Sequence, residues 1–272
     1  MGRYLSVFLA FILFCGHVYA QSGQKRNHRF TLFTDTVPEK EYPFILQDTP
    51  SALFTMRQSN ENFLSIYRLG IHELNKAFSP KISVITQVVL QGLFFMPLTH
   101  EEGHRSVLTN EGIGSISRPF FNKNLAAYVT GVSDQSLIDL RNANLPAFTR
   151  MYIGGLESDY ALMLRENSLM NFGDESPRTL WIEYAMRKVS LVSYYAMGLF
   201  KYNMGLKEES NELNRDIAGM DVYGAIRALH NPTEEFKRYV DYADLQPEEK
   251  RFVKRVGWRS FINLIDPTVL SI

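Results

Sequence analysis

The chain has 272 residues, of which 29 are Lys or Arg and 29 are Asp or Glu, so its formal net charge is zero. A balanced charge argues against the basic surface that nucleic-acid-binding proteins present, and we expect no nucleic-acid partner. Hydrophobic residues make up 45% of the chain, which is enough for a sizeable core in one domain or two closely packed ones.

The first twenty residues have the features of a signal peptide. Arg3 precedes an apolar run at residues 5–15, and Val18-Tyr19-Ala20 forms a small-residue cleavage pattern. A retained anchor is the competing interpretation, but the run is shorter than the roughly 20 residues that a membrane-spanning helix needs. We therefore predict an exported, periplasmic or otherwise extracytoplasmic protein. Cleavage removes Cys15, the only cysteine, and leaves His, Asp and Glu as the possible metal ligands.

The remaining sequence predicts a short arm followed by one helical domain. Residues 21–50 are expected to form an extended N-terminal arm, and residues 51–272 a mainly α, multi-helix domain with a buried HExxH helix and little β-structure. Gly, Ser and Pro residues between 110 and 124 predict a loop or small hairpin. Apolar periodicity predicts helices over residues 61–78, 82–98, 133–151, 156–170, 179–202, 216–229, 233–242 and 247–264.

Residues 82–98 are almost wholly apolar and lead directly into a histidine motif. Seventeen such residues fit a fully buried helix at least as well as a membrane span. We favour burial in a soluble core because the chain lacks other clean spans, and a membrane association remains the alternative.

The motif is His100-Glu101-Glu102-Gly103-His104. On a helix, side chains four residues apart project about 40° from one another, so His100 and His104 can bind the same ion. Histidine nitrogen is a preferred zinc ligand, and zinc lowers the pKa of bound water to about 7. Glu101, one step round the helix, is placed to act as the general base on that zinc-bound water. The other interpretation is a solvated helix end that carries two incidental histidines.

Across residues 98–108 the sequence resembles the HExxH zinc metallopeptidases, the zincins. The resemblance implies a Zn²⁺ site held by His100 and His104, the glutamate between them as catalytic base, and a peptide or protein substrate. The metzincin subclass would need glycine at position 107 and histidine at position 110. Val107 and Asn110 stand there instead, which excludes that subclass.

The pattern also resembles the gluzincin arrangement, in which a carboxylate on a later helix is the third ligand. Glu157 is the candidate, because Gly154-Gly155 would let the preceding turn pack tightly against the motif helix and would place Glu157 in the first turn of a new helix. An acidic residue also simply stabilises a helix N-terminus, so that role is an equal alternative.

Asp221 is the second candidate for the third ligand. Site-2-type intramembrane proteases also contain HExxH and take an Asp far downstream as ligand, so a resemblance to that group would select Asp221. The alternatives for Asp221 are a helix N-terminal carboxylate or a partner that orients a histidine.

Two classes of function thus compete. The leading hypothesis is an exported zinc-dependent hydrolase, most simply a metallopeptidase, in a soluble or a membrane-embedded form. The other is a non-catalytic helical module that binds a partner in the cell envelope through its apolar and aromatic residues, among which are 19 Phe and 14 Tyr.

Overall fold

The computed structural model describes residues 40–48, 55–118, 127–172 and 175–270. The described chain is mainly α-helical, which confirms the predicted fold class, with one small antiparallel sheet formed by β1 (Ile116–Arg118) and β2 (Tyr128–Thr130). This pair lies where a loop or small hairpin was predicted. The predicted signal peptide, residues 1–20, and most of the predicted arm, 21–39 and 49–50, lie outside the described residues.

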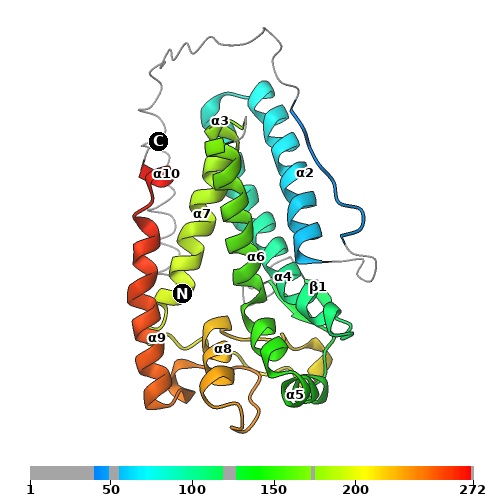
Figure 1. Ribbon diagram of the computed structural model, residues 1–272, viewed down its shortest axis with the longest axis vertical. Helices are drawn as coiled ribbons and strands as arrows, with labels where there is room; N and C mark the ends of the chain where they lie inside the picture. The colour runs from blue at the N-terminus through cyan, green and yellow to red at the C-terminus, as the bar shows by residue number, and fades with distance from the viewer. Residues whose placement is uncertain (1–39, 49–54, 119–126, 173–174, 271–272) are drawn as a thin grey trace.

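Long helices dominate the fold (Figure 1). Short 3₁₀ turns, η2 (Glu212–Asn214), η3 (Tyr242–Asp244) and η4 (Phe261–Leu264), connect or extend them. In chain order the main helical elements are α2 (Met56–Ala77), α3 (Pro80–Leu90), the π-helical turn η1 (Gln91–Phe95), α4 (Met96–Asn110), α5 (Asp134–Ala143), α6 (Leu145–Phe172), α7 (Pro177–Ala196), α8 (Asp221–His230), α9 (Pro247–Ser260) and α10 (Pro267–Leu270).

Local sequence determines where several of these helices begin. Thr55 caps α2 by accepting a hydrogen bond from the backbone N–H of Gln58, and Ser133 caps α5 in the same way. Helix α9 begins with proline in its first turn and a reciprocal capping box between Gln246 and Glu249, as the Gln-Pro-Glu-Glu sequence indicates. These caps satisfy backbone donors that a helix cannot bond internally.

Helix α4 lies at the centre of the fold, in contact with α2 on one side and α6 on the other. Helix α6 also packs against α7 and α8, and α9 runs along the outer side of α7, as Figure 1 shows. The motif helix therefore packs against two long helices, one of which, α6, also packs against α8.

The contact between α4 and α6 is made by glycines. A Cβ atom added to Gly103 would lie 2.3 Å from the carbonyl oxygen of Gly154, and one added to Gly155 would lie 2.4 Å from Nε2 of His100. The predicted tight packing of Gly154-Gly155 on the motif helix is confirmed. The predicted helix break at these glycines is wrong, because α6 runs without interruption from Leu145 to Phe172. Glycine weakens a helix interior by about 1 kcal/mol, and the close packing offsets this cost.

Helices α3, η1 and α4 form one apolar helix, Pro80–Asn110, whose most apolar 18-residue window has a mean hydropathy of 1.6. By length and composition it could cross a membrane, and only 28% of that window is buried. The prediction that residues 82–98 are fully buried is therefore wrong. The face of α3 and η1 that points inward is polar, with Ser83, Gln87 and Gln91 buried, whereas Ile85 and Val89 are exposed.

Two further predictions differ from the structure. Residues 233–242 form turns and bends rather than a helix, and α8 begins at Asp221 instead of near residue 216. In the second case the chain before Asp221 packs against β2, where the N–H of Ile217 donates to the carbonyl oxygen of Val129. Tertiary contacts here outweigh local helical tendency.

Candidate metal centre

Two buried histidines of α4 meet a buried aspartate from a distant part of the sequence. His100, His104 and Asp221 each offer one ligand atom, and these atoms all lie within 4.8 Å of one another. Nε2 of His100 lies 3.0 Å from Oδ2 of Asp221, and Nε2 of His104 lies 3.5 Å from the same oxygen. Both imidazoles therefore direct their Nε2 atom toward the same oxygen of Asp221.

The other nitrogen of each imidazole is tied elsewhere. Nδ1 of His104 donates to the carbonyl oxygen of Met151 at 2.7 Å, and Nδ1 of His100 donates to Oδ2 of Asp159 at 2.8 Å. A proton on Nδ1 leaves a lone pair on Nε2 in the neutral ring, which is the form that binds a metal. The surroundings thus select the tautomer that a metal ligand needs.

The fold explains why these residues meet. His100 and His104 lie one turn apart on α4, and Asp221 is the first residue of α8. Helix α6 crosses α4 at Gly154 and Gly155, and in an uninterrupted helix the residue four positions after Gly155 faces the same way. That residue is Asp159, which the sequence analysis did not select.

The structure does not bring Glu157 to the histidines, so its predicted role as third ligand is corrected. Its carboxylate forms two hydrogen bonds of 2.7 Å with Arg150 at the surface. Glu157 lies two positions before Asp159, which is about 200° around a helix, so the two side chains point in nearly opposite directions. The alternative prediction, that Glu157 is a helix N-terminal carboxylate, is also wrong because α6 begins at Leu145.

A cavity of about 310 Å³ opens at the histidines. Glu101, the predicted general base, lines it without belonging to the three possible ligands, as does Asp216. Met96, Pro97 and other apolar residues form part of its wall. The ring of Tyr194, which the sequence analysis also did not select, lines the cavity and stacks on His100 with 5.2 Å between ring centroids.

The charges in this cavity shift the protonation of its members. Burial opposes ionisation of Asp221, but the adjacent His104 and His100 outweigh it and hold the pKa of Asp221 well below its usual range. Burial alone would lower the pKa of His104, yet Asp221 raises it. Burial raises the pKa of Glu101, which suits a residue that must take up a proton. The negative charge of Asp221 is therefore retained beside the two histidines.

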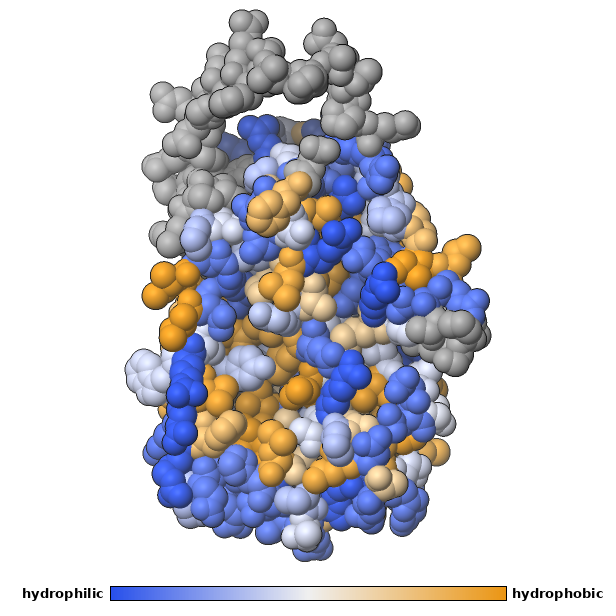
Figure 2. Space-filling model, viewed as in Figure 1, coloured by the Kyte–Doolittle hydropathy of each residue, from blue (hydrophilic) through white to orange (hydrophobic). Residues whose placement is uncertain are grey.

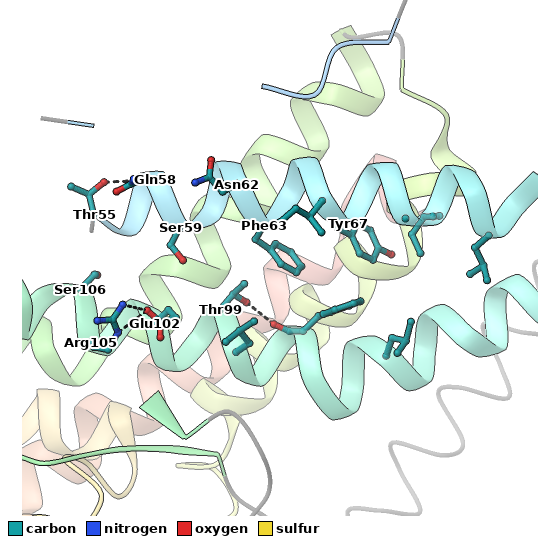
Figure 3. Close-up of a pocket in the computed structure, with 17 residues that line it drawn as sticks. Thr55, Gln58, Ser59, Asn62, Phe63, Tyr67, Thr99, Glu102, Arg105 and Ser106 are labelled. Carbon is teal, nitrogen blue, oxygen red and sulfur yellow. Dashed lines mark hydrogen bonds and ion pairs between the residues drawn. The ribbon is translucent and has the colours of Figure 1, made fainter. Parts of the chain in front are cut away.

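A larger apolar cavity, of about 660 Å³, lies on another face of α4 (Figure 3). Glu102 and Arg105 of α4 form an ion pair at its polar end, and Phe63 and Tyr67 of α2 lie along it. None of His100, His104 and Asp221 lines this cavity, so it is separate from the candidate metal centre.

The donor set fits a borderline transition metal. Two imidazole nitrogens and one carboxylate oxygen match the three protein ligands of catalytic zinc sites, which leave one position open, whereas Ca²⁺ and Mg²⁺ prefer oxygen ligands throughout. The buried group His100, His104 and Asp221 could hold a metal ion. Comparison with models of protein families, with curated proteins and with solved structures finds no match to this chain. The resemblance to zincins therefore depends on the motif residues alone.

Proposed function

We propose that this chain is an exported zinc-dependent hydrolase, most simply a metallopeptidase, with His100, His104 and Asp221 as metal ligands and Glu101 as general base. The observation that carries the proposal is the convergence of both Nε2 atoms on Oδ2 of Asp221 while both Nδ1 atoms are bonded elsewhere. An incidental pair of histidines has no need of this arrangement.

A bound zinc ion would supply Lewis acidity, polarising the scissile carbonyl and lowering the pKa of water to about 7. Glu101 would accept a proton from the attacking water at its carboxylate and return it to the leaving nitrogen. Burial raises the pKa of Glu101, which favours proton uptake, and Met96 and Pro97 form an apolar part of the wall beside it.

The test compares Glu101→Gln with the matched neighbour variant Glu102→Gln. Glu102 lies on the same helix but lines the other cavity, where it pairs with Arg105. We expect zinc-loaded wild type and Glu102→Gln to cleave a mixed quenched-fluorescence peptide library, and Glu101→Gln to retain zinc but lose turnover. Turnover that survives in Glu101→Gln would refute the role of Glu101 as general base. A wild type that binds no zinc would favour a non-catalytic binding module instead.

A second candidate, a hydrolase embedded in or seated on a membrane, is favoured by one specific observation. Along α3 and η1 the buried positions are Ser83, Gln87 and Gln91, while the exposed positions include Ile85 and Val89. Polar residues facing a bundle interior and apolar residues facing outward are typical of a lipid-exposed helix. The choice of Asp221 as third ligand also agrees with a resemblance to site-2-type proteases.

Charge argues against full embedding. Helix α7 buries three ionisable side chains, Arg187, Lys188 and Glu183, which are rare in membrane-spanning segments. Pro80–Asn110 is the one helix in the described residues with the length and composition of a span. Solubility without detergent distinguishes the soluble hydrolase from the membrane-embedded one. We expect residues 21–272 to stay monodisperse in detergent-free buffer by light scattering, and a requirement for detergent would favour the membrane form.

A further inference from the structure

A chain of buried charged groups runs from His100 into the interior of the helix bundle. Asp159 accepts from Nδ1 of His100 through Oδ2, at 2.8 Å, and from Nη1 of Arg187 through Oδ1, at 2.5 Å. Nε of Arg187 donates to Glu183, one turn earlier on α7. The side chains of Arg187 and Glu183 are fully buried, and that of Asp159 is 2% exposed.

The guanidinium group of Arg187 is held from three helices. Glu183 approaches it from α7 and Asp159 from α6, while its central carbon lies 5.5 Å from the ring centroid of Phe63 on α2. A guanidinium group over an aromatic face at this distance makes a favourable cation–π contact. Contacts from α2, α6 and α7 therefore hold the Arg187 side chain beside Asp159.

Stability alone does not explain such a chain. Removing charged groups from water is costly, and well-packed apolar residues of similar volume are often equally or more stabilising than a buried ion pair. This row of charged groups ends at His100, a candidate metal ligand, whose ring must keep a fixed orientation to bind an ion. Both oxygens of Asp159 are engaged, one by Arg187 and one by His100, so the carboxylate can neither rotate nor turn away from the imidazole.

We propose that Arg187 is a positioning residue for the metal centre, which acts through Asp159 to fix the ring orientation and tautomer of His100. This inference rests on the metal ligands of the proposed function but not on hydrolysis. Hydrogen-bond partners of metal-binding histidines commonly change metal affinity by about 10–100-fold when they are removed. Arg187 extends that effect one residue further from the metal.

The experiment measures zinc dissociation constants by competition with a chromophoric chelator. Arg187→Met should weaken zinc binding by about 10-fold or more, because Asp159 loses the contact that holds it. The matched control is Lys188→Met. Lys188 is the next residue on α7, is also buried and also pairs with an acid, but its bonds go to Tyr184 and Asp266 rather than to Asp159. Its zinc affinity should equal that of wild type.

A double-mutant cycle tests the route through Asp159. If Arg187 acts only by holding Asp159, then Arg187→Met combined with Asp159→Asn should bind zinc as weakly as Asp159→Asn alone. Arg187→Lys keeps a charge at this position and serves where the methionine variant does not fold. A lysine cannot reproduce the forked contact with both acids, so its zinc affinity should be intermediate.

The possible results separate this inference from the proposed function. Wild-type zinc affinity in both Arg187→Met and Arg187→Lys, or additive losses in the double mutant, would overturn the role of Arg187 and leave the hydrolase proposal intact. Tight zinc binding with the expected losses but no peptide cleavage would refute the hydrolase and leave Arg187 as a positioning residue. A wild type without zinc affinity would refute both.

Discussion

At Asp221 a single carboxylate oxygen faces two imidazole nitrogens, and these imidazoles hold the pKa of Asp221 below its usual range although the carboxylate is buried. Glu157 is chemically equivalent and closer in sequence to the histidines, yet it pairs with Arg150 at the surface. The difference between the two carboxylates is one of position, which substitution can test directly.

We expect Asp221→Ala to lose tight zinc binding and Glu157→Ala to retain it. Loss of a direct ligand should cost more than the roughly 10–100-fold loss caused by removing a hydrogen-bond partner of a ligand. The measurement is zinc content after dialysis, with His100→Ala as the positive control for loss. Retained stoichiometric zinc in Asp221→Ala would mean that another group completes the site.

At the scale of the element, the crossing of α4 and α6 depends on glycine. A Cβ atom at Gly103 would lie 2.3 Å from the backbone oxygen of Gly154, and backbone cannot move away as a flexible side chain can. Gly70, in the interior of α2, offers the opposite case, because a Cβ atom there would meet no heavy atom within 4 Å.

Gly103→Ala and Gly70→Ala should therefore change stability in opposite directions. Overpacking at Gly103 is expected to lower the free energy of unfolding by about 1–3 kcal/mol, whereas alanine at Gly70 should raise it by about 0.5–1 kcal/mol through helix propensity. Urea unfolding followed by circular dichroism measures both. Equal effects of the two substitutions would show that the helices do not cross as closely as the structure indicates.

At the scale of the whole molecule, one buried carboxylate links parts of the chain that are far apart. Glu175 precedes α7 and binds Lys40 of the N-terminal segment together with Arg68 and His72 of α2. Burial opposes ionisation of Glu175, but hydrogen bonds from Arg68, His72 and Lys40 outweigh it and lower its pKa to about 2.

This depressed pKa predicts how stability depends on pH. Because the folded pKa lies below the ordinary value of 4.5, Glu175 contributes stability fully above about pH 4.5, and that contribution is lost as the pH falls toward 2. Its upper limit is about 3 kcal/mol. Glu175→Gln should therefore destabilise the protein strongly at pH 7 and much less at pH 3, as measured by urea unfolding. A difference from wild type that does not vary with pH would contradict the proposed ion-pair cluster.

Apolar side chains also cover part of the surface of the whole molecule. Figure 2 shows apolar side chains gathered in the middle of the face in view. A shallow cavity of about 350 Å³ between α6 and α7 is lined by Leu156, Tyr160 and Leu191. Together with the exposed side of α3, this surface explains why 45% hydrophobic residues in the sequence did not all become core.

The sequence alone determined the mainly helical fold, several helix starts and the pairing of His100 with His104, because caps, apolar periodicity and the spacing of four act within a few turns of one helix. It also indicated that Gly154 and Gly155 would pack against the motif helix. What it could not determine was the rotation of α6. Treating the two glycines as a helix break placed Glu157 inward, whereas the uninterrupted helix places Asp159 there.

Only the tertiary structure decided the third ligand and the groups behind it. Asp221 lies 121 residues after His100, and Arg187 reaches Asp159 from another helix, so their meeting depends on how α4, α6, α7 and α8 pack. The sequence also could not determine what surrounds the apolar face of α3. An apolar run of 17 residues has the same pattern whether core, partner or lipid covers it. Local interactions fix the helices, and long-range packing fixes which of their faces meet.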